Sequence, residues 1–250
     1  MTNEHRAFGI DIGGSGIKGA PVDLEIGALE TQRLRIETPD PSTPEAVAGV
    51  VAEIVRAFDW KGPVGVTIPS VVERGVVRSA ANIDPSWVET DAVALLASTV
   101  PGAVTVLNDA DAAGVAEARF GAGRDADGVV LLLTFGTGIG SAILNDGVLV
   151  PNSELGHIEF NGMEAEHYCA ARLVEEDNMD VAIWVKRVDA YLHYVETLFS
   201  PQLIIFGGGI SKHFEDFSHL LTMRTPVVPA FLRNQAGIVG AALASTEVQR

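Results

Sequence analysis

The sequence has a single cysteine, Cys169, among its 250 residues. One cysteine excludes an internal disulfide framework and any cysteine-rich zinc site. No apolar run reaches the roughly 18 residues that a membrane-spanning helix needs. The start, MTNEHRAFG, lacks the basic and apolar regions of a signal peptide. We therefore expect a cytoplasmic protein with no membrane segment.

Positive charge is also scarce. The chain has 17 Lys and Arg against 33 Asp and Glu, which gives a net charge of −16. This balance argues against nucleic acid as a partner. An anionic substrate would need a local basic patch on a repelling background. The length and the hydrophobic fraction of 47% are ordinary and allow two modest domains or one large one.

Glycines gather early, in FGIDIGGSGIKGA, where Gly14, Gly16 and Gly19 have the spacing G-x-G-x-x-G. In a dinucleotide site this spacing opens a helix, and an acidic residue follows about 20 positions later at the end of a second strand. Here Pro21 and an apolar/polar alternation predict a strand instead. The acid at that distance, Asp40, lies between two prolines. We therefore exclude the dinucleotide site and predict a strand, a phosphate-facing glycine turn and a second strand. No P-loop motif occurs either.

Strands and helices alternate along the chain, and the pattern starts again near residue 127. The spacing of apolar residues predicts strands at 7–14, 18–24, 32–37, 63–71, 103–109, 127–135, 139–145 and 202–210, and helices at 41–58, 91–100, 110–118, 181–199 and 236–245. The Asn-Asp-Gly turn at 145–147 predicts one more strand directly after it. TFGTGIGSA in the second half repeats the arrangement of IDIGGSGIKGA. Two such hairpins facing one cleft are typical of the actin-like ATPase (ribonuclease H-like) α/β fold. We expect one lobe at 1–108, with the closing helix at about 236–250 packed back on it, and a second lobe at 109–235.

Ordered motifs carry a specific resemblance: DIGGSGIKG, LNDADAAG, TFGTGIG, ELGH and FGGGISK. In this order and spacing they resemble the ROK family (repressor, open reading frame, kinase) of sugar kinases. GVVRSAANIDPSW and VLVPNSELGHIEF are most similar to its polyphosphate glucokinases and polyphosphate/ATP glucomannokinases. The resemblance implies phosphoryl transfer from inorganic polyphosphate, with ATP as a further donor, to the 6-hydroxyl of glucose. It also implies Mg²⁺, a homodimer and mannose as an alternative acceptor.

Asp109 follows a strand at the carboxyl end, where open α/β sheets place their ligand sites. A hydroxyl that accepts a phosphoryl group needs a nearby carboxylate to take its proton. The resemblance assigns this general base to Asp109 and a sugar contact to Asn108. Two alternatives stay open: Asn108 and Asp109 could cap the following helix, and Asp111 is a second candidate for the base.

The motif ELGH places Glu154 and His157 three residues apart, and a carboxylate beside an imidazole can bind adjacent sugar hydroxyls. A structural histidine is the alternative for His157. The resemblance adds Glu166 as a further sugar-binding acid, with Glu164 as the competitor for that place. Many ROK proteins bind zinc through this histidine and a following cysteine cluster, but NGMEAEHYCAAR retains only Cys169. We therefore expect no zinc site.

Asn82 and Trp87, in AANIDPSW, are expected either on the sugar side of the cleft or in packing. Relatives usually have Pro-Gly where this chain has Pro69-Ser70, so Ser70 could affect sugar preference.

Glycine turns let backbone N–H groups approach phosphate oxygens, and hydroxyl groups add donors. The resemblance places the phosphoryl donor at both hairpin turns and after the strand 202–210, with these residues: Gly13, Gly14, Ser15, Gly16, Gly136, Thr137, Gly138, Gly208 and Gly209. For the last glycines a tight turn is the alternative. Asp11 is expected to hold Mg²⁺ through water. Lys18 is expected either to pair with phosphate or to point outward.

A polyphosphate chain needs basic contacts, and the candidates are few: Lys18, Lys212, Arg224 and Arg233, followed by Arg74 and Arg78. An ATP-dependent ROK hexokinase is the alternative function. A non-catalytic sugar-binding protein is less favoured, because about eight residues precede the first strand and leave no room for a helix-turn-helix.

Overall fold

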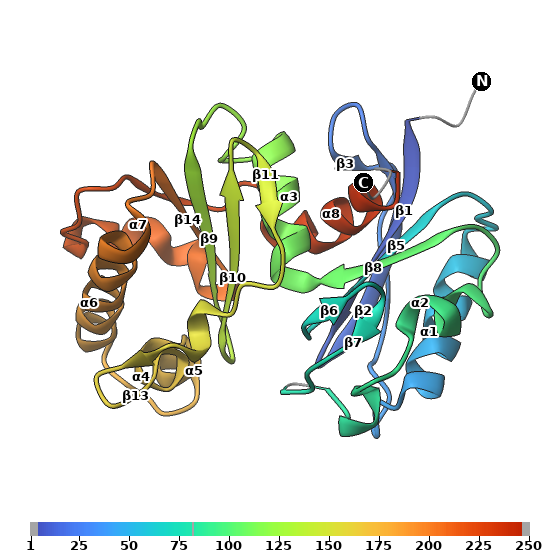
Figure 1. Ribbon diagram of the computed structural model, residues 1–250, viewed down its shortest axis with the longest axis horizontal. Helices are drawn as coiled ribbons and strands as arrows, with labels where there is room; N and C mark the ends of the chain where they lie inside the picture. Colours follow the sequence, from blue (N-terminus) through green and yellow to red (C-terminus); the bar gives the residue numbers. More distant parts are fainter. Residues whose placement is uncertain (1–4, 82, 247–250) are drawn as a thin grey trace. The chain divides into compact units, whose positions relative to one another are not determined.

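The structure, a computed structural model, describes residues 5–81 and 83–246 (Figure 1). The chain divides into two compact units, Met1–Ala116 with Gln235–Arg250, and Glu117–Asn234. The boundary expected between residues 108 and 109 falls at the first residue of helix α3 (Asp109–Phe120). Most of this helix belongs to the first unit.

The first unit is built on a sheet with the strand order β3–β2–β1–β5–β8, and β4 also pairs with β2. The bounds are Arg6–Gly13 for β1, Gly16–Asp23 for β2, Ala28–Leu29 for β3, Leu34–Ile36 for β4, Val64–Ile68 for β5 and Val104–Asn108 for β8. Strand β1 is antiparallel to β2 and parallel to β5, and β5 is parallel to β8. All five strands expected in this half are confirmed. Strand β3 and the small hairpin of β6 (Val72–Glu73) and β7 (Val76–Val77) were not predicted.

Helix α1 (Pro44–Ala57) begins where its sequence signals place it. The Thr43 hydroxyl accepts a hydrogen bond from the backbone N–H of Ala46 at 3.4 Å, and Pro44 is in the first turn. Its apolar stripe, including Val47, Val51 and Ile54, is buried in the core of this unit. Helix α2 (Ala92–Ala97) begins after Asp91, whose carboxylate accepts from Ala94 N at 2.8 Å. The short 3₁₀ helix η1 (Pro85–Trp87) precedes it.

Helix α8 (Ala236–Ala244) packs on β1 and β5 at backbone distance. A Cβ atom at residue 9 would lie 1.8 Å from the carbonyl oxygen of Ile238, and one at residue 65 would lie 1.7 Å from that of Ala241. Glycine is therefore required at Gly9 and Gly65 because a side chain would push the helix off the sheet. This contact explains why the C-terminal helix belongs to the first unit.

The second unit repeats the same topology with the strand order β11–β10–β9–β14–β15. The bounds are Val129–Phe135 for β9, Ile139–Asn145 for β10, Val148–Val150 for β11, Leu203–Gly207 for β14 and Val227–Pro229 for β15. Strand β9 is antiparallel to β10 and parallel to β14, as β1 is antiparallel to β2 and parallel to β5. Both units thus have the duplicated α/β topology expected of the actin-like fold, and the predicted repeat of the glycine hairpin is confirmed.

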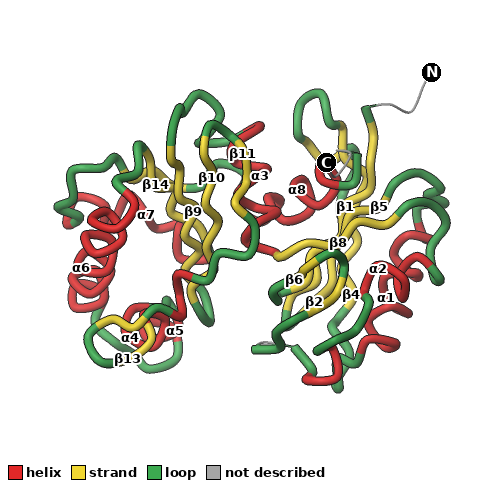
Figure 2. Tube along the Cα trace, in the orientation of Figure 1, coloured by secondary structure: helices red, strands yellow, loops and turns green. Residues whose placement is uncertain are grey.

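Helix α6 (Val181–Phe199), predicted at the same bounds, covers an aromatic core. The rings of Phe135 and Phe206 stack at 4.5 Å, and Trp184 of α6 meets Phe135 edge to face at 6.2 Å. Figure 2 labels four short elements of the second unit that were not predicted: β13, α4, α5 and α7. The unpredicted short elements between β11 and α8 include η2 (Leu155–His157), β12 (Glu159–Phe160), β13 (Met163–Glu164), α4 (Ala165–Cys169), α5 (Arg172–Glu175), η3 (Gly209–His213), α7 (Phe214–Phe217), η4 (Ser218–Leu220) and η5 (Arg233–Gln235).

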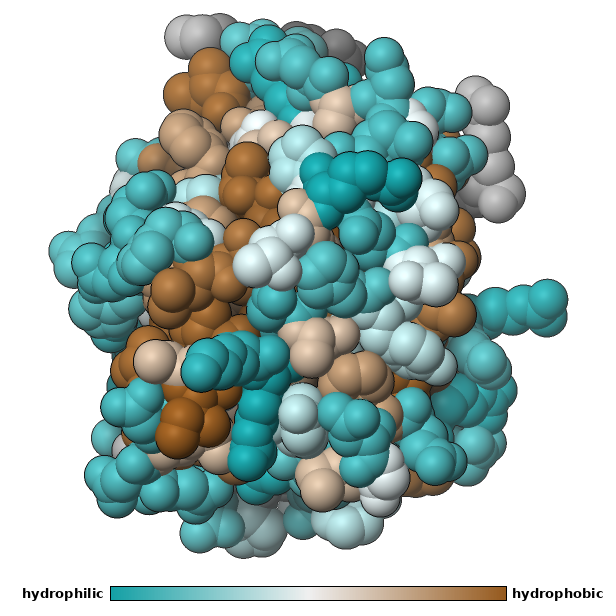
Figure 3. Space-filling model, turned by 90° about the vertical axis from the view of Figure 1, so that its left-hand side faces the viewer, coloured by the Kyte–Doolittle hydropathy of each residue, from teal (hydrophilic) through white to brown (hydrophobic). Residues whose placement is uncertain are grey.

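The outer face of α6 has apolar side chains that are not covered. Ile183, Tyr194 and Leu198 are exposed by 52%, 38% and 54%. The space-filling view of this side of the molecule shows apolar patches among polar side chains (Figure 3). Of the helices that the structure describes, none combines the length and the apolar character of a membrane span.

Candidate active site

The first glycine turn joins β1 to β2, with Gly13 paired to Gly16 across it. Side chains from β4 and the residues that follow it hold both ends of the turn. Thr38 Oγ1 donates to the carbonyl oxygen of Gly13 at 2.5 Å, and Arg35 Nη2 donates to that of Ser15 at 2.6 Å. Gly14 lies in open space, since a Cβ atom there would meet nothing within 4 Å. The turn is held in place by its carbonyl oxygens while the space over Gly14 stays accessible.

Arg35 explains the glycine at position 16. A Cβ atom on Gly16 would lie 2.6 to 2.7 Å from Nε, Cζ and Nη2 of Arg35. The guanidinium group therefore lies directly over the Cα atom of Gly16, and a larger residue would displace it. Gly16 is needed here for a close approach and not for a left-handed backbone angle, because its φ is not positive.

Asp11 is the carboxylate beside this turn, near the end of β1. Thr67 Oγ1, on the neighbouring strand β5, donates to Asp11 Oδ1 at 3.1 Å and accepts from Ile12 N at 3.3 Å. Lys18 Nζ lies 3.6 Å from Asp11 Oδ2. Lys18 thus pairs with Asp11 and does not point freely outward, and its pairing with phosphate stays a prediction. The carboxylate group is thus oriented by a hydroxyl group and neutralised by an ammonium group.

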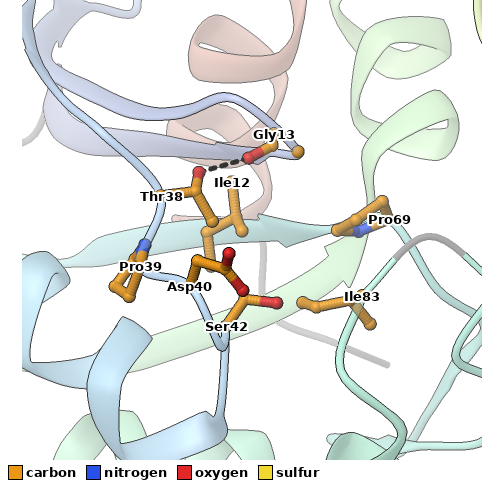
Figure 4. A pocket seen from close by; sticks show the side chains of 9 residues that line it. Ile12, Gly13, Thr38, Pro39, Asp40, Ser42, Pro69 and Ile83 are labelled. Atoms are coloured by element: carbon orange, nitrogen blue, oxygen red, sulfur yellow. Dashed lines mark hydrogen bonds between the residues drawn. The ribbon is translucent and has the colours of Figure 1, made fainter.

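A pocket of about 260 Å³ opens beside the first turn (Figure 4). Its wall comes from the end of β1, the loop before α1, and the residue after β5. The lining residues are Ile12, Gly13, Gly14, Thr38, Pro39, Asp40, Ser42, Pro69 and Ile83. Figure 4 shows the polar groups of Thr38, Asp40 and Ser42 on one side and Pro69 with Ile83 on the other. Polar groups among apolar ones in a concave wall are typical of a small-molecule site.

Asn108 and Asp109 follow one another at the carboxyl end of β8 and the start of α3. Asn108 is the residue that caps the helix: its Oδ1 accepts from Ala110 N at 2.8 Å and from Asp111 N at 3.0 Å. Its Nδ2 donates to the carbonyl oxygen of Ser70 at 3.2 Å, which fixes the orientation of the amide. Asp109 Oδ1 accepts from Ala110 N at 2.8 Å, and its side chain is half-buried. Asp111 is 2% exposed, so Asp109 is the more accessible of the two carboxylates.

Ser70 is buried next to Asn108, with 3% exposed surface. Its Oγ atom is inaccessible and has no hydrogen-bond partner within the described chain. An unpaired buried hydroxyl group costs stability, of the order of 1–3 kcal/mol. The contact between Ser70 and Asn108 runs through the backbone carbonyl oxygen, so it would also form with glycine at this position.

The second glycine turn, between β9 and β10, has an acidic neighbour. Gly136 N donates to the carbonyl oxygen of Gly138 at 3.0 Å within the turn, and Thr137 is exposed. A Cβ atom on Gly138 would lie 2.4 Å from Glu166 Oε2, and the same oxygen accepts from Ile139 N at 3.3 Å. The two glycine turns thus differ in charge: a guanidinium group lies against the first and a carboxylate group against the second.

Glu154, His157, Glu164 and Glu166 form one cluster in the second unit. His157 Nδ1 lies 3.1 Å from Glu164 Oε2, and His157 Nε2 lies 3.9 Å from Glu154 Oε2. The ligand atoms of His157, Glu164 and Glu166 lie within 4.8 Å of one another. The two candidates for the further acid therefore have different neighbours: Glu164 contacts the imidazole, whereas Glu166 contacts the glycine turn.

Electrostatics within this cluster shift two ionisable groups. Burial raises the pKa of Glu154, opposed by the charge of His157 and assisted by that of Glu166. The hydrogen bond that the imidazole makes to the Glu164 carboxylate raises the pKa of His157, and burial opposes this shift. Carboxylate oxygens and an imidazole nitrogen offer both donors and acceptors to adjacent hydroxyl groups of a sugar.

Cys169 lies at the end of α4 near this cluster and is fully buried. Burial raises the pKa of its thiol, and Sγ donates to the carbonyl oxygen of Ala165 at 3.4 Å. Cys169 is therefore part of the hydrophobic core of the second unit.

The turn after β14 contains two glycines, Gly208 and Gly209, and the local structure explains the first of them. Gly208 has a φ of +88°, and a Cβ atom there would lie 2.0 Å from the carbonyl oxygen of Phe135. Ser211 Oγ donates to the carbonyl oxygen of Gly208 at 2.7 Å and closes the turn into η3. Gly209 has open space around it. The tight turn is therefore sufficient to explain Gly208, while a ligand contact at Gly209 stays a prediction.

Of the AANIDPSW residues, Asn82 lies outside the described residues. Trp87 has no exposed surface, and its Nε1 donates to the carbonyl oxygen of Ser42 at 2.9 Å. It belongs to the core of the first unit, so the packing alternative is the one that the structure favours.

The basic residues that are candidates for contact with polyphosphate differ in whether an acidic side chain already lies next to them. Arg78 is bound to both Glu73 and Glu89, and Arg224 Nε lies 3.9 Å from Glu196. Lys212, Arg233 and Arg74 are exposed.

Three residues around the first turn, Arg35, Thr38 and Thr67, were not singled out from the sequence. They come from separate strands and loops, and only the strand register brings them to the turn.

Comparison with known proteins agrees with this architecture. Residues 7–173 match the model of the ROK family. A polyphosphate glucokinase from Mycobacterium tuberculosis is 52% identical over 245 residues, which is 98% of this chain and 92% of that protein. The crystal structure of an inorganic polyphosphate/ATP-glucomannokinase from Arthrobacter sp. strain KM has a TM-score of 0.91 and 51% identity, and covers 96% of this chain and 97% of its own. A ROK family glucokinase from Streptomyces griseus, solved with glucose and AMPPNP, has a TM-score of 0.80 and 25% identity, over 96% and 99% of the two chains.

Proposed function

This chain belongs to the ROK family, and from that premise we propose that it is a polyphosphate-dependent glucokinase. It transfers a phosphoryl group from inorganic polyphosphate to the 6-hydroxyl of glucose. The observation that supports this most is the identity of 52% with a polyphosphate glucokinase over 98% of the chain. ATP is a second donor in the proposal, because the Arthrobacter relative is named for both donors.

Asp109 acts as the general base. It stands at the carboxyl end of β8, half-buried, with Asn108 fixed beside it by the Ser70 carbonyl and the α3 backbone. The 6-hydroxyl oxygen attacks the terminal phosphorus, its proton moves to Asp109, and the bond between the terminal phosphorus and the bridging oxygen breaks. The products are glucose 6-phosphate and a polyphosphate chain shortened by one unit.

Glu154, His157 and Glu166 bind sugar hydroxyl groups in this proposal, and Asn108 is a further sugar contact that the family resemblance implies. The close spacing of the three second-unit residues and their mixture of donors and acceptors support this role. Glucose is the primary acceptor, and mannose is an alternative acceptor suggested by the name of the Arthrobacter enzyme.

Mg²⁺ fits the chemistry of the first turn. Asp11 offers carboxylate oxygens, one of which is held by Thr67, and Mg²⁺ binds oxygen ligands through one or two carboxylates and several waters. When bound, the ion would neutralise charge on the donor phosphates. Asp11 would hold it through water, and Gly13, Gly14, Ser15 and Gly16 would present their backbone to the phosphate oxygens.

A homodimer and a cytoplasmic location complete the proposal. The exposed apolar residues Ile183, Tyr194 and Leu198 on α6 support a second copy as the partner of this face. Light scattering after gel filtration tests the dimer.

The competing function is an ATP-dependent ROK hexokinase, which the match to the Streptomyces griseus glucokinase solved with AMPPNP favours. Glucose 6-phosphate formation by the purified protein with Mg²⁺, measured in parallel with long-chain polyphosphate and with ATP at equal phosphate concentration, separates the two. Faster turnover with polyphosphate supports the proposal. Turnover with ATP alone would favour the hexokinase, and turnover with neither would contradict both.

A further inference from the structure

We propose that Arg35 is a donor-binding residue, whose guanidinium group contacts the phosphate oxygens of the anionic phosphoryl donor at the first glycine turn. This inference rests on the proposed kinase function and names a contact for its donor. It starts from a row of side chains across the sheet of the first unit.

Three strands place this row in register. Asp11 on β1 pairs with Lys18 on β2, and Lys18 pairs with Arg35 on β4. Directly paired residues project from the same face of a sheet, so the two cations and the carboxylate share one face. Like charges directly opposite one another destabilise a sheet. A cation pair retained in this position is the kind of local conflict that is expected at a functional site.

The charges in the row do not cancel. Lys18 is matched by Asp11, with 3.6 Å between Nζ and Oδ2. Arg35 is exposed, and its hydrogen bond is to a backbone carbonyl, that of Ser15. Among residues 5–81 and 83–246, no carboxylate oxygen lies within 4.0 Å of its guanidinium nitrogens. In a chain with a net charge of −16, this leaves one uncompensated cation at the turn.

The geometry holds the guanidinium group at the place where phosphate is expected. It lies over the Cα atom of Gly16, and its contact with Ser15 uses one of five N–H donors. A planar guanidinium group binds phosphate oxygens with two parallel hydrogen bonds. The second glycine turn offers the opposite charge, because Glu166 lies against Gly138. A polyanion is therefore favoured at the first turn and repelled at the second.

The test compares Arg35→Gln, Arg35→Lys and the wild type, with Arg56→Gln as the matched control. Arg56 is an exposed arginine in the last turn of α1 in the same unit. Initial rates are measured with polyphosphate and with ATP at several salt concentrations, together with the Kd for glucose. Binding of inorganic polyphosphate without glucose is measured by calorimetry, so that the inference stays testable if the wild type proves to be no kinase.

For Arg35→Gln we expect the KM and Kd for polyphosphate to rise about tenfold, the usual size for losing one charge-assisted contact. The plot of log affinity against log salt should become shallower by roughly one unit, since one fewer cation meets phosphate. Arg35→Lys should keep the wild-type salt slope because it keeps the charge. The Kd for glucose and the Arg56→Gln values should not change.

An unchanged polyphosphate Kd and salt slope in Arg35→Gln would overturn the inference. Equal loss of glucose and polyphosphate binding would also overturn it, because that result would assign Arg35 a structural role in holding the Ser15 carbonyl. An effect with ATP but not with polyphosphate would identify the nucleotide as the donor at this turn and overturn the assignment for the polymer. Failure of the wild type to form glucose 6-phosphate would contradict the proposed function alone.

Discussion

Glu164 and His157 form a direct pair, with 3.1 Å between Oε2 and Nδ1. The contact orients the imidazole ring and turns its other nitrogen toward Glu154, 3.9 Å away. A carboxylate that fixes one nitrogen of a histidine determines which chemistry the other nitrogen can offer.

The first prediction concerns this pair and pH. The pKa of His157 is raised by the hydrogen bond to Glu164, so the protonated form is favoured by folding. The stabilisation is fully present below the usual pKa of 6.5 and disappears as the pH rises through the raised value. Glu164→Gln should therefore lower the free energy of unfolding at pH 6, by less than about 1 kcal/mol because the pair is exposed, and leave it unchanged at pH 9. Urea titrations at both pH values measure this. Equal losses at pH 6 and pH 9 would contradict it, and Glu159→Gln, an exposed neighbour, is the control.

The second prediction concerns Glu154, whose ionisation should lower the stability of the protein as the pH rises, the opposite of the effect of a glutamate with a lowered pKa. Burial raises its pKa, so the ionised form opposes folding, and stability falls as the pH rises above the usual value of 4.5. We predict that Glu154→Gln is slightly more stable than the wild type at pH 8, by a fraction of 1 kcal/mol. Its KM for glucose should rise about tenfold, because a charged acceptor of a hydroxyl hydrogen bond is lost. A variant that loses stability while keeping its KM would refute both parts.

Replacing Ser70 tests whether its unpaired buried hydroxyl group lowers the stability of the protein. Because its Oγ is buried without a partner, Ser70→Ala should raise the free energy of unfolding by about 1 kcal/mol. The hydrogen bond from Asn108 to the Ser70 carbonyl should persist, since it is made to the backbone. Denaturant midpoints and the KM for glucose are the readouts. A rise in KM would mean that the hydroxyl group contacts the sugar, contrary to its burial here.

Gly208 and Gly209 are neighbours in different environments, so the effects of the same substitution at each can be compared. Gly208 has a positive φ and lies against the Phe135 carbonyl, whereas Gly209 has open space around it. Gly208→Ala should destabilise the protein by at least about 2 kcal/mol, and Gly209→Ala by less than about 0.5 kcal/mol. Thermal unfolding compares them. Similar melting temperatures for the two variants would show that the strand-to-helix turn does not need glycine at 208.

The sequence predicted the elements that have a clear period or a clear turn. The hairpins at 7–24 and 129–145 follow from short apolar segments on either side of glycine turns, and α1 and α6 follow from helical spacing with good caps. Several short elements, such as β3 and α4, were missed because so few residues carry no measurable period. The sequence also did not predict which residues lie opposite one another on neighbouring strands. Thr67 and Arg35 reach the first turn through the register of β5 and β4, which depends on tertiary contacts.

For the candidate site, the sequence identified residues whose motif is contiguous, such as Glu154 and His157 in ELGH. It could not decide between Glu164 and Glu166, because the short elements β13 and α4 direct them to different neighbours. Trp87 was left between two roles, since a buried tryptophan and a sugar-stacking tryptophan have the same sequence signature. Its hydrogen bond to the Ser42 carbonyl is a tertiary contact.

The most direct test of the account is glucose 6-phosphate formation from polyphosphate by the wild type and Asp109→Asn, with the Kd for glucose measured on both. We predict active wild-type enzyme and a kcat that falls by about 10²- to 10⁴-fold in Asp109→Asn, with glucose binding nearly unchanged, because the amide cannot accept the proton. Asp91→Asn, at the start of α2 in the same unit, should keep wild-type activity because asparagine also caps helices. An Asp109→Asn variant that retains most of its kcat, or a wild type that forms no glucose 6-phosphate, would contradict the central claim.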